Sequence, residues 1–98
     1  MILNLPNKEI QRLCVLHHVD QLYLFGSALT NDFKLESDVD FLVKFKPIDL
    51  FYYFDNYLSL KNALKRLLGR EVDLIEEQTL KNPVLRSSID RNKSLLYG

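Results

Sequence analysis

Two apolar segments, each joined to a small polar motif, limit the possible folds of this chain more than any other feature. Residues 19–25 end in four consecutive apolar side chains, as in a strand buried on both faces, and Gly26-Ser27 follows them at once. Ten residues later, Asp38-Val39-Asp40 opens a segment, residues 38–45, in which apolar side chains recur at every second position. This alternation is typical of a strand. The sequence therefore predicts two strands joined by a polar turn and loop over residues 28–37.

Helical spacing and helix-ending residues account for most of the remaining chain. Pro6-Asn7 is suited to open a first helix, because proline is tolerated in a first turn, and apolar residues recur on one face as far as His17. Asp49 is a plausible helix N-cap and Gly69 a helix end, and the segment between them is the longest predicted helix. The prediction is completed by a third strand over residues 71–75, a last helix over residues 84–91 and an apolar tail, Leu95-Leu96-Tyr97.

The predicted order is helix, strand, strand, helix, strand, helix. A strand pair with a third strand that returns after a long helix predicts an α/β (α+β) fold, in which a two-layer mixed sheet has flanking helices. The length of 98 residues agrees with one domain over residues 1–98.

Charge and cysteine content narrow the functional classes. Lys+Arg and Asp+Glu number 13 each, so the formal charge is zero, which argues against a protein that binds duplex DNA through a broad basic surface. The single Cys14 excludes an internal disulfide and a cysteine zinc cluster, and its apolar neighbours predict a buried, inert thiol. No apolar run approaches the roughly 20 residues that cross a membrane, and no signal peptide pattern is evident. We therefore expect a cytoplasmic protein with no membrane association.

The longest predicted helix carries more apolar side chains than one face can bury. Its main stripe runs from Leu50 to Leu67 at three- and four-residue spacing, and Phe54 and Leu58 widen it. An aromatic cluster lies in its first half: Phe51, Tyr52, Tyr53, Phe54 and Tyr57. The helical spacing favours core packing or a protein interface over base stacking, and rings left exposed would mark a partner surface.

Asp38 and Asp40 are the first candidates for chemistry. On a strand, residues i and i+2 point to the same face at a spacing of roughly 6.5–7 Å, so their carboxylates repel each other. A divalent cation between them removes that conflict, and Mg²⁺, which takes hard oxygen ligands together with substrate phosphates, fits best. Taken alone, two aspartates at the start of a strand more often face solvent, and it is the neighbouring features that favour the metal.

Asp73 lies in the third predicted strand and adds a carboxylate to the same face if that strand pairs beside residues 38–45. Three carboxylates suit a two-metal phosphoryl-transfer site, in which one ion holds the triphosphate and the other activates the attacking oxygen. An isolated aspartate in a charged strand is usually a surface residue, so this interpretation depends on Asp38 and Asp40.

Gly26-Ser27 follows a buried strand, and ligands of α/β sheets usually bind where strands end. Glycine lets the main chain approach a phosphate closely, and a serine hydroxyl donates to a phosphate oxygen. An isolated Gly-Ser pair is usually a simple turn, so its meaning also depends on the aspartates that follow.

Together, these features resemble the signature of the polymerase-beta-like nucleotidyltransferase superfamily: an apolar strand ending in Gly26-Ser27, then ten residues, then Asp38-Val39-Asp40 entering another strand. The shortness of the chain and the later Glu71-Val72-Asp73-Leu74-Ile75 resemble its minimal nucleotidyltransferase (MNT) group. The carboxyl-terminal part, Leu80 to Tyr97, is similar to that of the same group. The resemblance covers most of the chain from Val19 onward.

This resemblance implies the polymerase-beta-like nucleotidyltransferase fold and a role for each motif. Gly26 and Ser27 match the phosphate-gripping pair, Asp38 and Asp40 match the metal-binding pair, and Asp73 matches the third carboxylate. Members of the MNT group are often antitoxins paired with a HEPN-family ribonuclease toxin, and some transfer AMP from ATP to a tyrosine of that partner. The expected cofactor is Mg²⁺, as two ions when nucleotide is bound, and the expected substrate is ATP.

One departure from the group bears on activity. Many members carry an arginine shortly after Gly-Ser, whereas this chain has Ala28-Leu29-Thr30-Asn31. A cation that would steady the triphosphate is then missing, unless Lys34 or a partner residue replaces it. Two other hypotheses stay open: an antitoxin that neutralises its partner by contact alone, and transfer to a small molecule or RNA end, for which this short chain has no obvious acceptor-binding domain.

Overall fold

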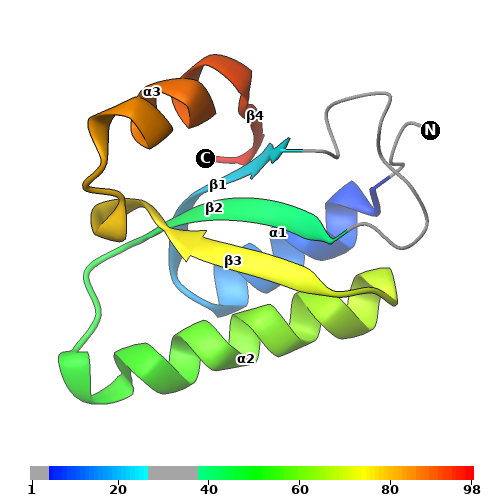
Figure 1. The fold of residues 1–98 in the computed structure, drawn as a ribbon. Coiled ribbons are helices and arrows are strands. Elements are labelled where there is room, and N and C mark those ends of the chain that lie inside the picture. Colours follow the sequence, from blue (N-terminus) through cyan, green and yellow to red (C-terminus); the bar gives the residue numbers. More distant parts are fainter. Residues whose placement is uncertain (1–4, 27–37) are drawn as a thin grey trace.

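The computed structural model describes residues 5–26 and 38–98, and its elements follow the periodicity of the sequence closely (Figure 1). The first strand has the predicted bounds, and the long helix ends at the predicted glycine. In chain order the elements are α1 (Asn7–Leu16), β1 (Val19–Phe25), β2 (Val39–Phe45), α2 (Leu50–Leu68), β3 (Val72–Glu76), the short 3-10 helix η2 (Glu77–Thr79), α3 (Pro83–Asn92) and β4 (Ser94–Tyr97).

The strands form one mixed sheet in the order β3-β2-β1-β4. β1 pairs antiparallel with both β2 and β4, whereas β2 and β3 are parallel and are joined through α2. A parallel pair needs such a crossover, because a tight turn can join only antiparallel neighbours. The predicted mixed sheet with flanking helices is therefore confirmed.

Alternation along β2 sorts its side chains onto the two faces of the sheet. Val39, Phe41 and Val43 are 0% exposed and belong to the main hydrophobic core, which they share with residues of α1 and α2. Figure 1 shows these two helices on one side of the sheet. Cys14 lies in the same core, where burial raises the pKa of its thiol to about 12, in agreement with the predicted inert thiol.

Both ends of α2 have the expected caps. The Asp49 carboxylate accepts a hydrogen bond from the backbone N–H of Phe51 at 2.9 Å, and Gly69 adopts the left-handed conformation, with φ of 65°, that ends many helices. Lys65 and Arg66 lie in the last turn, where their charges complement the helix dipole. Among the helices that the structure describes, none is both long and apolar enough to cross a membrane.

The apolar stripe of α2 is narrower than predicted. Leu60 and Leu64 are fully buried against the sheet. The prediction was wrong for three residues of the stripe, which are exposed to different degrees: Leu50 at 86%, Phe54 at 65% and Leu58 at 37%. Six residues separate Phe54 from Leu60, which turns its side chain by about 120° away from the sheet at 3.6 residues per turn.

The carboxyl-terminal tail is a strand and not only an apolar segment. β4 pairs antiparallel with the outer edge of β1, with Leu95 opposite Tyr23 and Tyr97 opposite Leu22. This pairing covers backbone groups that an edge strand would otherwise leave open. The fourth strand is therefore an addition to the predicted order of elements.

The other face of the sheet carries polar side chains together with η2 and α3. By the alternation of β2, Asp40, Leu42 and Lys44 point to this face. Leu42 is 1% exposed although it lies outside the main core, as does Ile89 of α3, which is 5% exposed. Figure 1 shows α3 on the side of the sheet away from α2, and η2 contacts β2. The η2–α3 segment therefore covers this face around Leu42.

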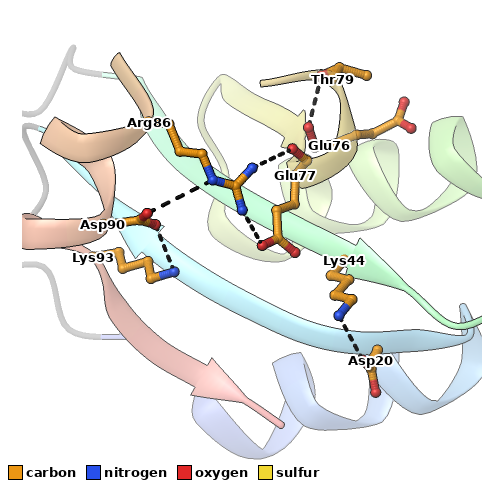
Figure 2. Close-up of polar contacts among 8 residues, drawn as sticks. All are labelled: Asp20, Lys44, Glu76, Glu77, Thr79, Arg86, Asp90 and Lys93. Carbon is orange, nitrogen blue, oxygen red and sulfur yellow. Dashed lines mark hydrogen bonds and ion pairs between the residues drawn. The ribbon is translucent and has the colours of Figure 1, made fainter. Parts of the chain in front are cut away.

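Charged side chains fasten α3 to its neighbours, as Figure 2 shows. Arg86 donates to the Glu77 carboxylate of η2 at 2.9 Å and lies 3.9 Å from the Asp90 carboxylate. Lys93 donates to Asp90 at 3.0 Å, and its Nζ lies 4.1 Å from the ring centroid of Tyr23 in β1. The sequence analysis missed this network, although Arg86 and Asp90 have the i, i+4 spacing of helical ion pairs.

Replacing Asp49 with alanine removes the N-cap of α2. We expect the free energy of unfolding to fall by about 1 kcal/mol, measured by urea denaturation. Asp55→Ala, at an exposed position inside the same helix, is the matched control and should change stability by less than about 0.5 kcal/mol. Equal losses in the two variants would contradict the capping role.

Candidate active site

Asp40 and Asp73 meet near the starts of two parallel strands. The register of β2 with β3 places Asp40 directly opposite Asp73, and the register of β1 with β2 places Phe25 on the other side of Asp40. Residues directly opposite each other point to the same face of a sheet. Both carboxylates therefore lie on the face away from α1 and α2, where Asp40 is partly buried and Asp73 is exposed. For these two residues the predicted convergence is present.

Four effects disfavour the ionised form of Asp40. In order of size, they are partial burial of its carboxyl, the negative charge of Asp73, a side-chain hydrogen bond with Asp73 and the negative charge of Asp38. Together they raise the pKa of Asp40 from 3.8 to about 6. Two carboxyl groups in contact favour a state in which they share one proton. A bound cation would take the place of that proton and relieve the same repulsion.

Gly26, directly after β1, fits closely against Asp40. Its φ of 77° lies in the left-handed region that favours glycine. A Cβ at this position would collide with Oδ2 of Asp40 and lie 3.2 Å from its Cγ. The sequence predicts that this glycine lets the main chain approach a phosphate closely. The structure adds a second reason for glycine here, because the Asp40 carboxyl occupies the space that a side chain would need. A ligand at the Gly26 backbone would lie next to that carboxyl.

Of the other predicted site residues, the structure describes Asp38 but not Ser27. Asp38 is exposed just before β2, and its charge is near enough to raise the pKa of Asp40. Within residues 5–26 and 38–98, no three His, Cys, Asp or Glu side chains form a group that could hold a metal ion by themselves. Ser27 lies outside the described residues. The donors on this face are thus the Asp40–Asp73 pair with Asp38 beside it.

Two lysines of this face are engaged with other groups. Lys44 Nζ lies 4.0 Å from the Asp20 carboxylate, and Lys93 Nζ lies 3.0 Å from the Asp90 carboxylate (Figure 2). Lys93 Nζ also lies over the Tyr23 ring. Neither is therefore a free substitute for the arginine that many MNT proteins carry after Gly-Ser. Lys34 and residues 28–31, on which that part of the prediction rests, lie outside the described residues.

Comparison with known proteins decides the family. The family model described as "Polymerase beta, Nucleotidyltransferase" matches residues 8–98. The chain belongs to this nucleotidyltransferase family. A candidate protein adenylyltransferase of Methanocaldococcus jannaschii is 35% identical over 81 residues, which are 83% of this chain and 78% of that protein. The protein adenylyltransferase MntA of Thermococcus cleftensis is 35% identical over 69 residues, which are 70% of this chain and 67% of that protein.

Solved structures share the fold of this nucleotidyltransferase. A candidate minimal nucleotidyltransferase superposes with a TM-score of 0.75 at 31% identity, over 90% of this chain and 86% of that one. A chain from the complex of tri-AMPylated Shewanella oneidensis HEPN toxin with MNT antitoxin gives a TM-score of 0.58 at 22% identity, over 94% of this chain and 69% of that one. The predicted polymerase-beta-like nucleotidyltransferase fold is confirmed.

The raised pKa of Asp40 makes stability depend on pH. Between about pH 4 and 6 the folded chain holds a proton that the unfolded chain has lost, so the free energy of unfolding falls as pH rises through this window. In Asp40→Asn this fall should be absent. At pH 7 the variant should be more stable by about 1 kcal/mol, once solvent screening of this partly exposed group is allowed for.

Urea denaturation in chelator-treated buffer at pH 4, 5, 6 and 7 measures this effect. Asp55→Asn, at an exposed position of α2, is the matched control and should follow the wild-type pH dependence. An Asp40→Asn variant that loses stability with rising pH as the wild type does would show that the pKa of Asp40 is not raised in the folded chain.

Proposed function

We propose that this nucleotidyltransferase transfers AMP from ATP to a tyrosine hydroxyl of a HEPN-type toxin and thereby acts as an antitoxin. The observation that carries the proposal is the contact of Asp40 with Asp73 beside the left-handed Gly26. The relatives named as protein adenylyltransferases support the reaction. The fold shared with the complex of an AMPylated HEPN toxin and its MNT antitoxin supports the partner. A reaction that consumes ATP also favours the cytoplasm as its place.

In the proposed reaction the tyrosine oxygen forms a bond to the α-phosphorus, the bond between that phosphorus and the α–β bridging oxygen breaks, and pyrophosphate leaves. The backbone at Gly26, with Ser27, would hold the phosphates close to Asp40. Asp73, the more exposed member of the pair, would accept the hydroxyl proton and orient the attacking oxygen.

The donors of this site suit magnesium. Mg²⁺ is commonly held by one or two carboxylates together with substrate phosphates, so a complete cage of protein ligands is not required. Asp38, Asp40 and Asp73 are the residues that would hold it, as one or, with nucleotide bound, two ions. When bound, the metal would neutralise charge on the triphosphate and on the attacking oxygen. The repulsion between Asp40 and Asp73 is the physical reason why a cation fits here.

Transfer of label from α-³²P-ATP to a co-purified HEPN toxin tests this function. The wild-type chain with MgCl₂ should label the toxin on tyrosine, with an added AMP found by mass spectrometry. Asp40→Asn and Asp73→Asn should each reduce the rate at least about 100-fold, because each removes charge stabilisation at the reacting phosphate. Asp55→Asn should label the toxin at the wild-type rate. Undiminished labelling by the Asp40→Asn/Asp73→Asn double variant would refute the site.

A second function, neutralisation by contact alone, is favoured by the exposed aromatic side chains of α2. Phe51 is 82% exposed and Phe54 is 65% exposed, which leaves apolar surface open to a protein partner. The departure after Gly26-Ser27 favours this alternative as well. In that case the Asp40→Asn/Asp73→Asn double variant would still protect cells from the toxin, whereas enzymatic neutralisation predicts that protection is lost together with labelling.

A further inference from the structure

A groove separates α1 from α2 on the helical layer of the protein. It has a volume of about 280 Å³ and is lined by Glu9, Arg12 and Leu13 of α1 and by Ala63, Arg66 and Leu67 of α2. The leucines and the alanine supply its apolar surface, and the charged residues supply the polar part. The groove therefore combines apolar surface with two arginines and one glutamate, which leave its charged lining net positive by one.

Side-chain hydrogen bonds link the two helices at one end of this groove. Asn56 of α2 donates to the backbone carbonyl of His17 at 2.8 Å, and His17 Nε2 lies 3.0 Å from Ser59 Oγ. These contacts fix the carboxyl-terminal end of α1 against the middle of α2. Toward the start of α1, the small side chain of Ala63 leaves the space between the helices unfilled. The groove is thus closed by hydrogen bonds at the end near His17.

Arg12 and Arg66 contribute cations without partners in the described part of the chain, where neither forms an ion pair or a side-chain hydrogen bond. Other basic residues do have partners: Lys65 lies 3.1 Å from the Glu71 carboxylate, and Arg86 lies 2.9 Å from that of Glu77. A guanidinium offers a planar set of donors that matches a carboxylate. The two arginines can therefore receive acidic groups from outside the chain.

Basic and acidic residues are unevenly distributed along the chain, and α1 and α2 carry an excess of basic residues. α1 and α2 together contain two acidic residues, Glu9 and Asp55, against five basic residues: Lys8, Arg12, Lys61, Lys65 and Arg66. Because the formal charge of the chain is zero, the remainder is net negative. The helical layer therefore attracts acidic partners, although the net charge gives no sign of it.

The size of the groove decides which class of ligand fits. Pockets for small molecules usually measure about 300–1,000 Å³ and enclose most of the ligand. This groove of about 280 Å³ lies just below that range, and its exposed arginines show that it is open to solvent, so it encloses less of a ligand than such pockets do. It has room for one or two side chains of a protein segment.

We infer that the α1–α2 groove is the docking site for an acidic, amphipathic segment of the protein partner, with an apolar side chain against Leu13 and Leu67 and carboxylates on Arg12 and Arg66. The existence of such a partner rests on the proposed function. α1 and α2 cover the face of the sheet opposite Asp40 and Asp73, so a segment in the groove leaves the carboxylate pair free. Docking and transfer thus use separate surfaces.

The test measures the Kd of the full chain for the co-purified HEPN toxin by isothermal titration calorimetry. Arg12→Glu/Arg66→Glu should weaken binding at least about tenfold, and Ala63→Leu should weaken it by filling the groove without removing a charge. Lys8→Glu/Lys61→Glu changes the net charge equally outside the groove and should bind within about twofold of wild type. Circular dichroism confirms that each variant is folded.

Several results would overturn the docking site. Wild-type affinity in both Arg12→Glu/Arg66→Glu and Ala63→Leu would do so, even if toxin labelling by the wild type shows that the proposed function is right. Equal weakening in the lysine control would assign the effect to overall charge. Binding of a single-stranded RNA oligonucleotide that is lost in the arginine variant, with an unchanged Kd for the toxin, would assign the groove to nucleic acid.

Conversely, loss of toxin binding in the groove variants without any labelling by the wild type would support the docking site and refute the transferase.

Discussion

The parallel register of β2 with β3 is the constraint on which the rest of this structure depends, because it places the carboxyl groups of Asp40 and Asp73 opposite each other. Two acidic groups placed opposite each other on neighbouring strands repel, and partial burial adds to the cost of ionising them. A sheet would not place them together for stability alone. The pair persists because the parallel register of β2 and β3 is held by the apolar residues between and around the two aspartates, such as Val39 and Phe41, which are buried on the other face. Stability and chemistry are thus assigned to opposite faces of the same strands.

The helices are likewise divided between the two faces of the sheet. α1 and α2 cover the apolar face, and α3 with η2 covers part of the polar face around Leu42 without belonging to the main core. The site lies beside Gly26, at the end of β1 and near the starts of β2 and β3, where strands of opposite direction meet. The proposed docking groove and the exposed aromatic side chains of α2 lie on the outer surface of the helical layer.

Much of this arrangement could be predicted from the sequence, because burial on a sheet or helix leaves a period in the chain. A continuous apolar run predicted β1 and alternation predicted β2, and Asp73 was expected on the same face as Asp40 if the third strand paired beside residues 38–45. β4 was missed because Leu95-Leu96-Tyr97 is too short to show a period, and its pairing depends on the turn after α3. The apolar residues of α2 showed a stripe but not which rings would face the sheet, so Phe54 was misassigned. The groove depends on the spacing of two helices, which no local pattern encodes.

The most direct test of the account is the titration of the Asp40 carboxyl carbon by ¹³C NMR, in chelator-treated buffer and again with MgCl₂ and a non-hydrolysable ATP analogue. We predict a pKa of about 6 for Asp40 without the cation and a clear fall in that pKa when the cation and nucleotide are added. A carboxyl that titrates near 4 in both conditions, or that does not respond to magnesium and nucleotide, would contradict it.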